Sequence, residues 1–497
     1  MANAPKVYDF PIAKVEEQLV SFLKKKKGAS TVADMIAGTG LPKYQVEQAA
    51  KVALDEYAGR LKVTESGDLL YYFPGGMRST VRGAGPSFRR FWKSFSRVAL
   101  RVLSLAFKIW IVVMLVGYFI AFVAIGVLAI VASLAANVAG SGRGGGRGRG
   151  GGLGGMYLGI RLFELILRMW FWTSILKDPR RKQKEGRAFY KSVFGFAFGE
   201  GDPNKGWDEA ERRHVIAYIR SHKGVITLEE LMALVGRESE EASALMNRLL
   251  LEYEGEPGVT DAGTVIYSFP ELMRTSESEQ RQIGQAPLLN PTMKSLVPFS
   301  ANKRRTNGWI IFFNAFNLGF GSYFLALSLT QGAAGLGKNG PLLYSFTGNL
   351  LAHAGISPVP VLGIALGIIP VAFSVLFFIV PLLRKIRVSR ENSAIRQDTL
   401  RRRVFAHVFS SPSRVDARDL RPTGAGLDPR DFAGACRRII ERLAAAMRAE
   451  PIVQEKEGVF AYRFAELERE IADLAAVRSS IDLKRYELGK TVFDSGK

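Results

Sequence analysis

Hydrophobic residues along this chain follow two different patterns. In some segments they recur every three or four positions, as at Val15, Leu19 and Leu23, which is the spacing of amphipathic helices. Elsewhere they form uncharged runs at least as long as the ~20 residues that cross a bilayer. These runs are residues 110–139, 309–330 and 359–383. The alternation predicts small folded domains separated by membrane helices.

A fourth apolar stretch, residues 152–176, is interrupted by charge. It contains Arg161, Glu164 and Arg168, which share one face at helical spacing. Two structures fit this pattern: a spanning helix with a polar face toward its neighbours, or an interfacial helix that lies on the membrane surface.

Two amphipathic segments repeat one another. Residues 54–74 read LDEYAGRLKVTESGDLLYYFP, residues 250–270 read LLEYEGEPGVTDAGTVIYSFP, and the two align without a gap. Upstream at the same offset, Thr31 aligns with Thr227. A repeat of this length indicates that the chain builds one structural unit more than once.

The repeated unit predicts three helices followed by a β-hairpin. A first amphipathic helix ends at a Lys-Gly turn. A short second helix follows, with a threonine N-cap (Thr31, Thr227) and a glycine stop (Gly40, Gly236). A third helix then leads into two strand-like runs joined by a glycine-bearing turn.

A third, weaker copy lies near the C-terminus. Residues 450–453 echo 256–259, and residues 462–464 echo 267–269. This copy needs one inserted residue in the hairpin and a longer region around the second helix. Ala465 replaces the proline that ends the other two hairpins.

The order helix, helix, helix, hairpin resembles the winged-helix superfamily. The resemblance implies three small winged-helix-like domains. Together with the apolar runs between them, it predicts an α-rich α+β fold in which transmembrane α-helical hairpins link these domains. We call these domains the first, second and third repeats. The expected boundaries are 1–76, 207–273 and 395–480 for the repeats, the last with a C-terminal helix, and 98–176 and 307–383 for the membrane hairpins, with a Gly/Arg-rich loop at 140–155.

Charge is distributed unevenly between the repeats and the membrane segments. The formal net charge is +22, yet the repeats hold nine basic and eight acidic residues over 12–75, six and thirteen over 208–271, and fourteen and eleven over 400–470. The excess basic residues instead flank the apolar runs in four clusters, which we call collars: residues 78–108, 177–187, 303–305 and 384–390. By the positive-inside rule, all four collars face the cytoplasm.

This placement predicts four membrane helices in two hairpins, with every repeat and both termini in the cytoplasm. It requires residues 152–176 to span, and it leaves three arginines of the 140–155 loop on the outer side. The alternative also keeps the repeats inside. In it, residues 110–139 form a re-entrant hairpin bent near Gly126, and residues 152–176 lie flat on the inner surface.

No catalytic constellation is recognisable, so an enzyme is not expected. The single cysteine, Cys436, reads as a small core residue on an amphipathic helix, and the four histidines have no ligand-like neighbours at motif spacing. We therefore expect neither a metal site nor a cofactor. Inside the membrane, small residues allow helices to approach and asparagines hydrogen-bond between them. The candidate packing residues are Asn314, Asn317, Gly363 and Gly367.

A DNA reader needs basic residues on its third helix. In the second repeat this helix begins ESEEASA, which is acidic. In the third repeat the same region holds four arginines, which are the candidate nucleic-acid contacts: Arg437, Arg438, Arg442 and Arg448. The repeats together are slightly acidic, which disfavours nucleic acid as the partner.

Residues 189–204, FYKSVFGFAFGEGDPN, together with the end of the second repeat, resemble a family of uncharacterised multi-pass bacterial proteins. That resemblance implies this layout in a bacterial inner (plasma) membrane and no activity. We expect a membrane-anchored scaffold or adaptor on an anionic inner leaflet, homo-oligomeric, whose winged helices bind a cytoplasmic protein or a second copy. A membrane-tethered DNA-binding regulator that uses the third repeat is the alternative, and a transporter or membrane enzyme is third.

Overall fold

In the computed structural model the chain divides into two compact units. The first unit comprises Met1–Ser87, Pro203–Leu296 and Asn392–Lys497, and the second comprises Phe88–Asp202 and Val297–Glu391. The structure describes residues 10–26, 28–74, 99–100, 102–140, 187–276, 292–337, 339–421, 429–453 and 460–495.

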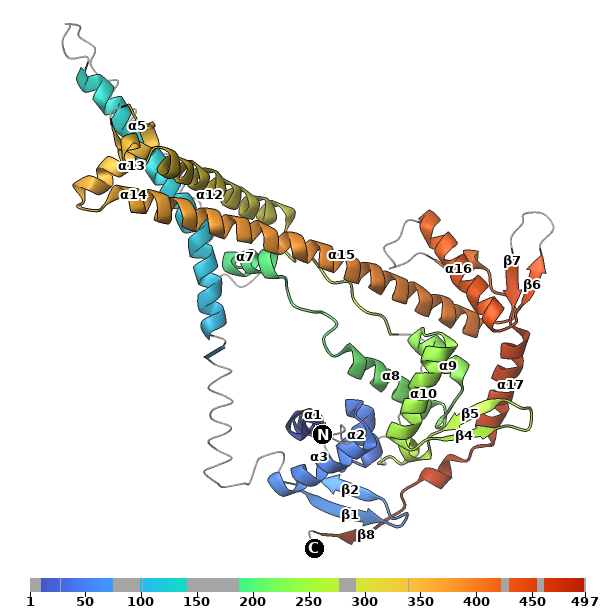
Figure 1. Ribbon diagram of the computed structural model, residues 1–497. Helices are drawn as coiled ribbons and strands as arrows, with labels where there is room; N and C mark the ends of the chain where they lie inside the picture. The colour runs from blue at the N-terminus through green and yellow to red at the C-terminus, as the bar shows by residue number, and fades with distance from the viewer. Residues whose placement is uncertain are drawn as a thin grey trace, which may run out of the picture. The chain divides into compact units, whose positions relative to one another are not determined.

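The first unit contains the three repeats (Figure 1). The first repeat consists of α1 (Ile12–Lys25), α2 (Val32–Thr39), α3 (Lys43–Glu56), β1 (Arg60–Thr64) and β2 (Leu69–Tyr72). The second consists of α8 (Trp207–Ser221), β3 (Val225–Ile226), α9 (Leu228–Val235), α10 (Ser239–Tyr253), β4 (Glu256–Val259), β5 (Val265–Ser268) and the 3-10 turn η2 (Pro270–Met273). The third uses the end of α15 (Ile369–Ser410), then η5 (Ala417–Asp419), α16 (Pro429–Ala446), β6 (Glu450–Val453) and β7 (Phe460–Arg463). The predicted α-rich character is confirmed, with only small sheets.

In each repeat, the last strand of the hairpin also pairs with the residue or short strand that precedes the second helix. In the second repeat this gives a three-stranded antiparallel sheet in the order β3-β5-β4. In the other two repeats a single antiparallel bridge takes the place of β3, between Ser30 and Tyr71 and between Val415 and Tyr462. The same antiparallel pairing therefore joins the hairpin to the second-helix region in all three repeats.

The second helix of the first two repeats begins and ends as its sequence predicts. The hydroxyls of Thr31 and Thr227 accept the backbone N–H groups of Asp34 and Glu230, whose carboxylates accept the threonine N–H in return. This is the capping box, which satisfies two N–H groups that the helix itself leaves unpaired. Both helices end at a glycine in the left-handed conformation.

A close contact explains why the repeated motif keeps a glycine ahead of the hairpin. A Cβ added to Gly255 would stand 2.4 Å from the ring of Phe269, and one added to Gly59 would stand 2.6 Å from the ring of Phe73. Phe269 is completely buried. The glycine therefore lets the third helix approach the end of the hairpin closely enough to cover this aromatic ring.

The repeats pack head to tail, with the end of one second helix against the first helix of the next repeat. Gly40, with φ of 73°, lies against α8, where an added Cβ would stand 2.9 Å from the carbonyl oxygen of Glu209. Gly236, with φ of 63°, lies against α15, where an added Cβ would stand 3.0 Å from the Cα of Arg402. The glycine that ends the second helix therefore contacts the next repeat in the same way at the first–second and second–third junctions.

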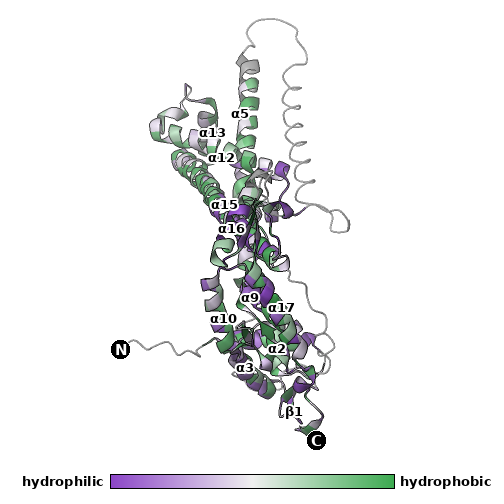
Figure 2. Cartoon of the chain, turned by 90° about the vertical axis from the view of Figure 1, so that its right-hand side faces the viewer, coloured by the Kyte–Doolittle hydropathy of each residue, from purple (hydrophilic) through white to green (hydrophobic). Residues whose placement is uncertain are grey.

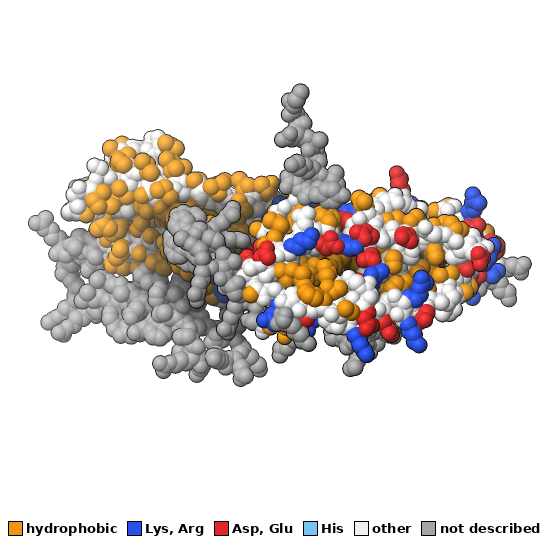
Figure 3. Space-filling model, turned by 90° about the horizontal axis from the view of Figure 1, so that it is seen from below, with side chains coloured by type: hydrophobic (Ala, Val, Ile, Leu, Met, Phe, Trp, Pro, Cys, Tyr) orange, Lys and Arg blue, Asp and Glu red, His pale blue; other side chains and the backbone are white. Residues whose placement is uncertain are grey.

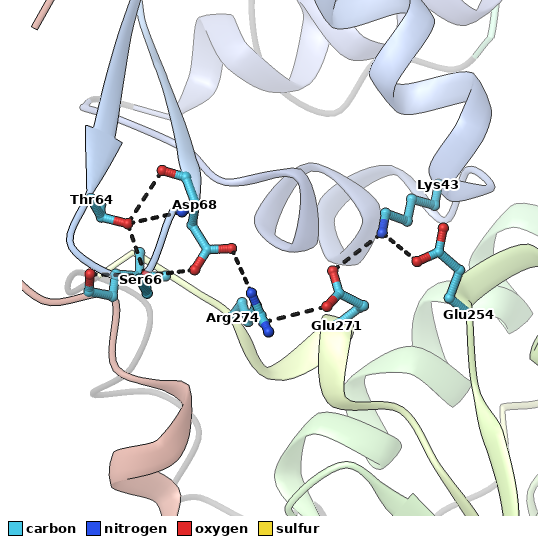
Figure 4. Close-up of polar contacts among 8 residues, drawn as sticks. Lys43, Thr64, Ser66, Asp68, Glu254, Glu271 and Arg274 are labelled. Carbon is cyan, nitrogen blue, oxygen red and sulfur yellow. Dashed lines mark hydrogen bonds and ion pairs between the residues drawn. The ribbon is translucent and has the colours of Figure 1, made fainter. Parts of the chain in front are cut away.

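The junction of the first and second repeats combines a shared core with a polar rim. Met35 and Ile36 of the first repeat belong to the same buried cluster as Ile216 and Leu272 of the second. Figure 4 shows the rim, in which the ammonium group of one lysine lies between two carboxylates and an arginine joins η2 to the first hairpin. The residues are Lys43 with Glu254 and Glu271, and Arg274 with Glu271 and Asp68.

The C-terminal segment returns to the first repeat. After α17 (Ala465–Ser480) and η6 (Leu483–Tyr486), the strand β8 (Thr491–Asp494) pairs antiparallel with β1 and makes the three-stranded sheet β2-β1-β8. The ammonium group of Lys62 lies 3.3 Å from the carboxylate of Asp494. The two ends of the unit are therefore joined in one sheet.

The second unit contains the apolar helices. It holds the π-helical turn η1 (Val113–Gly117), α5 (Tyr118–Gly140), α7 (Phe189–Phe198), α12 (Arg304–Thr330), η3 (Ala334–Leu336), α13 (Leu342–His353), α14 (Pro358–Pro360), the π-helical segment η4 (Val361–Ile368) and the start of α15. Three helical stretches among the described residues are long and apolar enough to cross a membrane: Val102–Leu134, Arg304–Thr330 and Pro358–Ser410. Figure 2 shows α5 and α12 as predominantly hydrophobic. These features are compatible with a membrane protein.

The structure differs from the sequence prediction at three points. The helix runs through Gly126 without a break, so a re-entrant hairpin bent there is wrong. The last apolar run and the first helix of the third repeat are one helix, α15, because the stretch from Arg384 to Ser410 contains neither glycine nor proline to stop it. The connection after α12 contains α13, which was not expected. Residues 152–176 and most of the 140–155 loop lie outside the described residues.

Replacement of Gly236 by alanine tests the head-to-tail contact. The variant must accommodate both a positive φ and a clash with the backbone of Arg402, so we expect a loss of roughly 2–4 kcal/mol in stability. Gly263→Ala is the matched control, since Gly263 has φ of 88° but open space around it. We expect it to cost only about 1–2 kcal/mol. Thermal unfolding of both full-length variants in detergent compares them, and equal losses would mean that Gly236 is needed only for its backbone conformation.

Candidate functional site

A buried carboxylate occupies the same place in the first two repeats. Asp34 and Glu230, the capping-box residues in the first turn of α2 and α9, are 1% and 2% exposed. A buried carboxylate is costly unless cations and hydrogen-bond donors surround it. The partners of these two residues therefore show how the repeats are held together.

Asp34 is neutralised in part from the second repeat. The guanidinium of Arg220, at the end of α8, lies 3.5 Å from one carboxylate oxygen, and the ammonium group of Lys26 lies 3.1 Å from the other. The backbone N–H and hydroxyl of Ser276 both donate to Asp34, at 3.2 and 2.7 Å. The residues around Asp34 thus join the first repeat to α8 of the second repeat and to the segment that follows η2.

Glu230 is neutralised by the helix that follows the third repeat. Arg478 of α17 donates to both carboxylate oxygens of Glu230, at 2.8 and 2.6 Å, and also to the carbonyl oxygen of Val225. The hydroxyl of Tyr218 donates to Glu230 at 2.8 Å. Burial and the nearby Glu230 carboxylate raise the pKa of Tyr218, so it remains a neutral hydrogen-bond donor.

A second carboxylate pair connects α17 to α9. Glu470 and Glu229 share a hydrogen bond, and burial together with the charges of Glu229 and Glu230 raises the pKa of Glu470 to about 9. Two carboxyl groups at hydrogen-bond distance hold one proton between them because both cannot ionise there without repulsion. The contact of α17 with the second repeat therefore includes a protonated carboxyl group.

Next to this pair a cleft of about 1450 Å³ opens between the second repeat, the end of α15, α16 and α17. One wall is acidic and comes from α9, α10 and α17, with Glu229, Glu238, Glu240, Glu466 and Glu470. The other wall is basic and comes from α15 and α16, with Arg396, Arg401, Arg438 and Arg442. Apolar side chains line the rest: Met232, Leu400, Phe405, Leu443, Met447 and Leu467.

The two walls of the cleft do not pair with each other among the described residues. Arg401 donates to Asp398 on its own helix, and among the described residues no ion pair crosses from α16 to the acidic wall. Opposite charges that face each other across open space can each accept a charged group of a ligand. The cleft is therefore suited to a segment that carries both signs of charge and an apolar face.

The four arginines predicted on the third helix of the third repeat do not form one surface. Arg438 and Arg442 line the cleft, one helical turn apart. Arg437 lies outside it and pairs with Glu441, at 2.8 Å. Arg448 follows α16 in the turn before β6, with φ of 50°, the place that Glu254 occupies in the second repeat with φ of 54°.

The candidate packing residues of the apolar helices all lie at helix contacts in the second unit. The amide of Asn314 donates to the carbonyl oxygen of Ser374 at 2.9 Å, and that of Asn317 donates to Leu115 in η1 at 2.7 Å. A Cβ at Gly363 would stand 2.5 Å from the hydroxyl of Ser328, and one at Gly367 would stand 3.1 Å from the backbone of Leu325. These contacts join α12 to η1 and to the helix formed by η4 and α15.

The described residues contain no group of three or more His, Cys, Asp and Glu that could hold a metal ion. Cys436 is buried in the core of the third repeat, and burial raises the pKa of its thiol to about 11. A thiol with such a pKa is a poor nucleophile at neutral pH. Cys436 therefore acts as a core residue.

Sequence reasoning did not find the acidic wall or the role of α17. Glu229 and Glu470 are distant in sequence, and each looks like an ordinary solvated acid on a helix. One signal was present: Asp34 and Glu230 occupy equivalent positions three residues after the N-cap threonine. That spacing predicts a capping box, but it does not reveal which arginine neutralises the carboxylate of the box.

Comparison with known proteins gives one relative and no activity. The chain is similar to an uncharacterised chloroplastic protein of Arabidopsis thaliana, with 25% identity over 414 residues, which is 81% of this chain and 73% of the relative. No family model and no solved structure matches.

The Glu229–Glu470 pair predicts a pH-dependent contact. Because the pKa of Glu470 is about 9 in the folded chain against an ordinary 4.5, its contribution is complete below about 4.5 and is lost as pH rises through about 9. We expect the melting temperature to fall between about pH 6 and about pH 9, and Glu470→Gln to flatten this dependence.

Glu466→Gln is the matched control, because Glu466 is an exposed carboxylate that lines the same cleft from the same helix. It should leave the pH profile unchanged. An unaltered profile in Glu470→Gln would show that the carboxyl pair does not control the contact. The measurement is thermal unfolding of the full chain in detergent at several pH values.

Proposed function

We propose that this protein is a membrane-anchored scaffold, and that the cleft between its second and third repeats binds a segment of a protein partner. The observation that supports this proposal is the composition of the cleft. Its two oppositely charged walls and its apolar lining suit an amphipathic polypeptide segment better than a small metabolite or a polyanion. In this proposal the repeats are winged helices that serve protein binding, consistent with their three helices and hairpin.

The membrane anchor in this proposal is multi-pass. Three apolar helical stretches support it, as do the basic residues that flank their uncharged runs, such as Lys108, Arg384 and Lys385. We infer that the repeats lie on the side of these basic collars. A bacterial inner membrane remains a prediction, because the relative that the chain resembles is named as chloroplastic.

DNA is the weaker candidate ligand. Arg438 and Arg442 share their cleft with Glu229, Glu238, Glu240 and Glu466, whose field would oppose the approach of phosphates. Arg437 already has a carboxylate partner. The molecular face in Figure 3 carries Lys and Arg side chains interspersed with Asp and Glu, unlike the continuous basic surface of a DNA-binding domain.

A photocrosslinking residue placed at Ala445, an exposed position that lines the cleft, tests this function in native membranes. We expect one discrete crosslinked protein, which is lost when Arg438 and Arg442 are both replaced by glutamate. Replacement of Arg437 by glutamate should retain it, since this neighbouring exposed arginine lies outside the cleft. A product of twice the chain mass would identify a second copy as the bound protein.

The proposal is contradicted if crosslinking is equal in the two variants or absent from the wild-type protein. The DNA-binding alternative predicts a gel shift by the full chain in detergent that weakens steeply with salt. If that shift disappears in the Arg438/Arg442 variant while no protein is crosslinked, the alternative replaces the scaffold.

A further inference from the structure

A second cavity lies in the second unit, at the start of the first apolar helical stretch. It has a volume of about 330 Å³ and opens between this stretch and α7, which lie beside each other (Figure 1). Its lining residues are Leu100, Ser104, Leu105, Lys108, Tyr190 and Lys191. The polar groups are thus two ammonium groups and two hydroxyls, all of which can donate hydrogen bonds.

The local helix geometry brings these donors together. Ser104 and Lys108 are four residues apart and therefore lie on one face of their helix. Tyr190 and Lys191 are in the first turn of α7, whose N-cap residue, Ala188, has no side chain to cap the helix. The unpaired N–H groups of this first turn add a partial positive charge to that of the two lysines.

The positive charge of the cavity is not neutralised by the described residues. No carboxylate among them lies within ion-pair distance of Lys108 or Lys191. The ammonium group of Lys108 lies 4.5 Å from the ring centre of Phe194, a contact that leaves its N–H groups available to a further acceptor. An anionic ligand would supply the missing acceptors.

The surface around the cavity indicates what kind of anion this is. Beside the cavity, Leu100, Val102 and Leu103 are 65%, 61% and 66% exposed. Trp110 follows and is half exposed, and tryptophan concentrates where a membrane helix meets the headgroup region. An anion-binding cavity beside exposed apolar side chains complements an amphiphile rather than a free inorganic ion.

We propose that this cavity binds the phosphate headgroup of an anionic membrane lipid. Lys108 and Lys191 contact the phosphate, the hydroxyls of Ser104 and Tyr190 donate hydrogen bonds to it, and an acyl chain lies along Leu100 and Leu103. The site depends on the membrane location of the second unit and not on the cleft of the first unit, so the two proposals can fail independently.

Native mass spectrometry of the detergent-purified full chain with short-chain phosphatidylglycerol or phosphatidylcholine tests the site. We expect phosphatidylglycerol to bind about tenfold more tightly, and this preference to disappear in the variant Lys108→Gln/Lys191→Gln. The control Lys385→Gln/Arg387→Gln removes the same charge from exposed positions of α15 outside the cavity and should keep the preference.

Three results would overturn the proposal. Equal losses in the two charge variants would show a general surface attraction, no preference in the wild-type protein would show no site, and displacement of the lipid by millimolar inorganic phosphate would show a soluble-phosphate site. Ser104→Ala/Tyr190→Phe keeps every charge and should weaken phosphatidylglycerol binding. Lys108→Arg/Lys191→Arg should retain it, which separates loss of the site from loss of the fold.

Discussion

Two buried carboxylates, Asp34 and Glu230, determine how the first unit is assembled. Each caps the second helix of its own repeat, and each is neutralised by an arginine from another segment, Arg220 or Arg478. Removing one partner from a buried ion pair typically costs about 3–5 kcal/mol, because the remaining charge is left uncompensated. A carboxylate that stabilises one helix therefore also requires a neighbouring segment to be present. The glycines at the ends of these helices let the first helix of the next repeat approach closely, α8 at Gly40 and α15 at Gly236.

This assembly also determines which surfaces remain open. The repeats bury their helix ends against one another and α17 covers part of the second repeat, whereas α16 keeps an exposed basic face toward the cleft. At the first apolar helical stretch of the second unit, α7 brings donors to a cavity that has no carboxylate among its lining residues. In the cleft, two oppositely charged walls that do not pair with each other flank largely buried apolar side chains, and in the cavity two lysines lie beside exposed apolar residues. That combination is typical of binding sites rather than of catalytic centres.

The sequence predicted local structure well where the chemistry is local. The threonine N-caps, the glycine stops and the apolar runs each depend on neighbours within a few residues, and Thr31, Gly40 and their counterparts behave as expected. Long-range pairing could not be predicted, since nothing in the spacing of Glu230 identifies Arg478 as its partner. The arginines on α16 formed one group in the sequence but separate in space, because Arg437 and Arg438 point to different sides of the helix.

The central claim is that the carboxylate of Glu230 and the guanidinium of Arg478 stabilise the first unit as a pair. A double-mutant cycle with Glu230→Gln and Arg478→Gln, followed by unfolding of the full chain in detergent, measures this directly. The account predicts that each single change is strongly destabilising and that the two are coupled by about 2 kcal/mol or more. Effects that add to within about 0.5 kcal/mol would contradict it, because the two groups would then act independently.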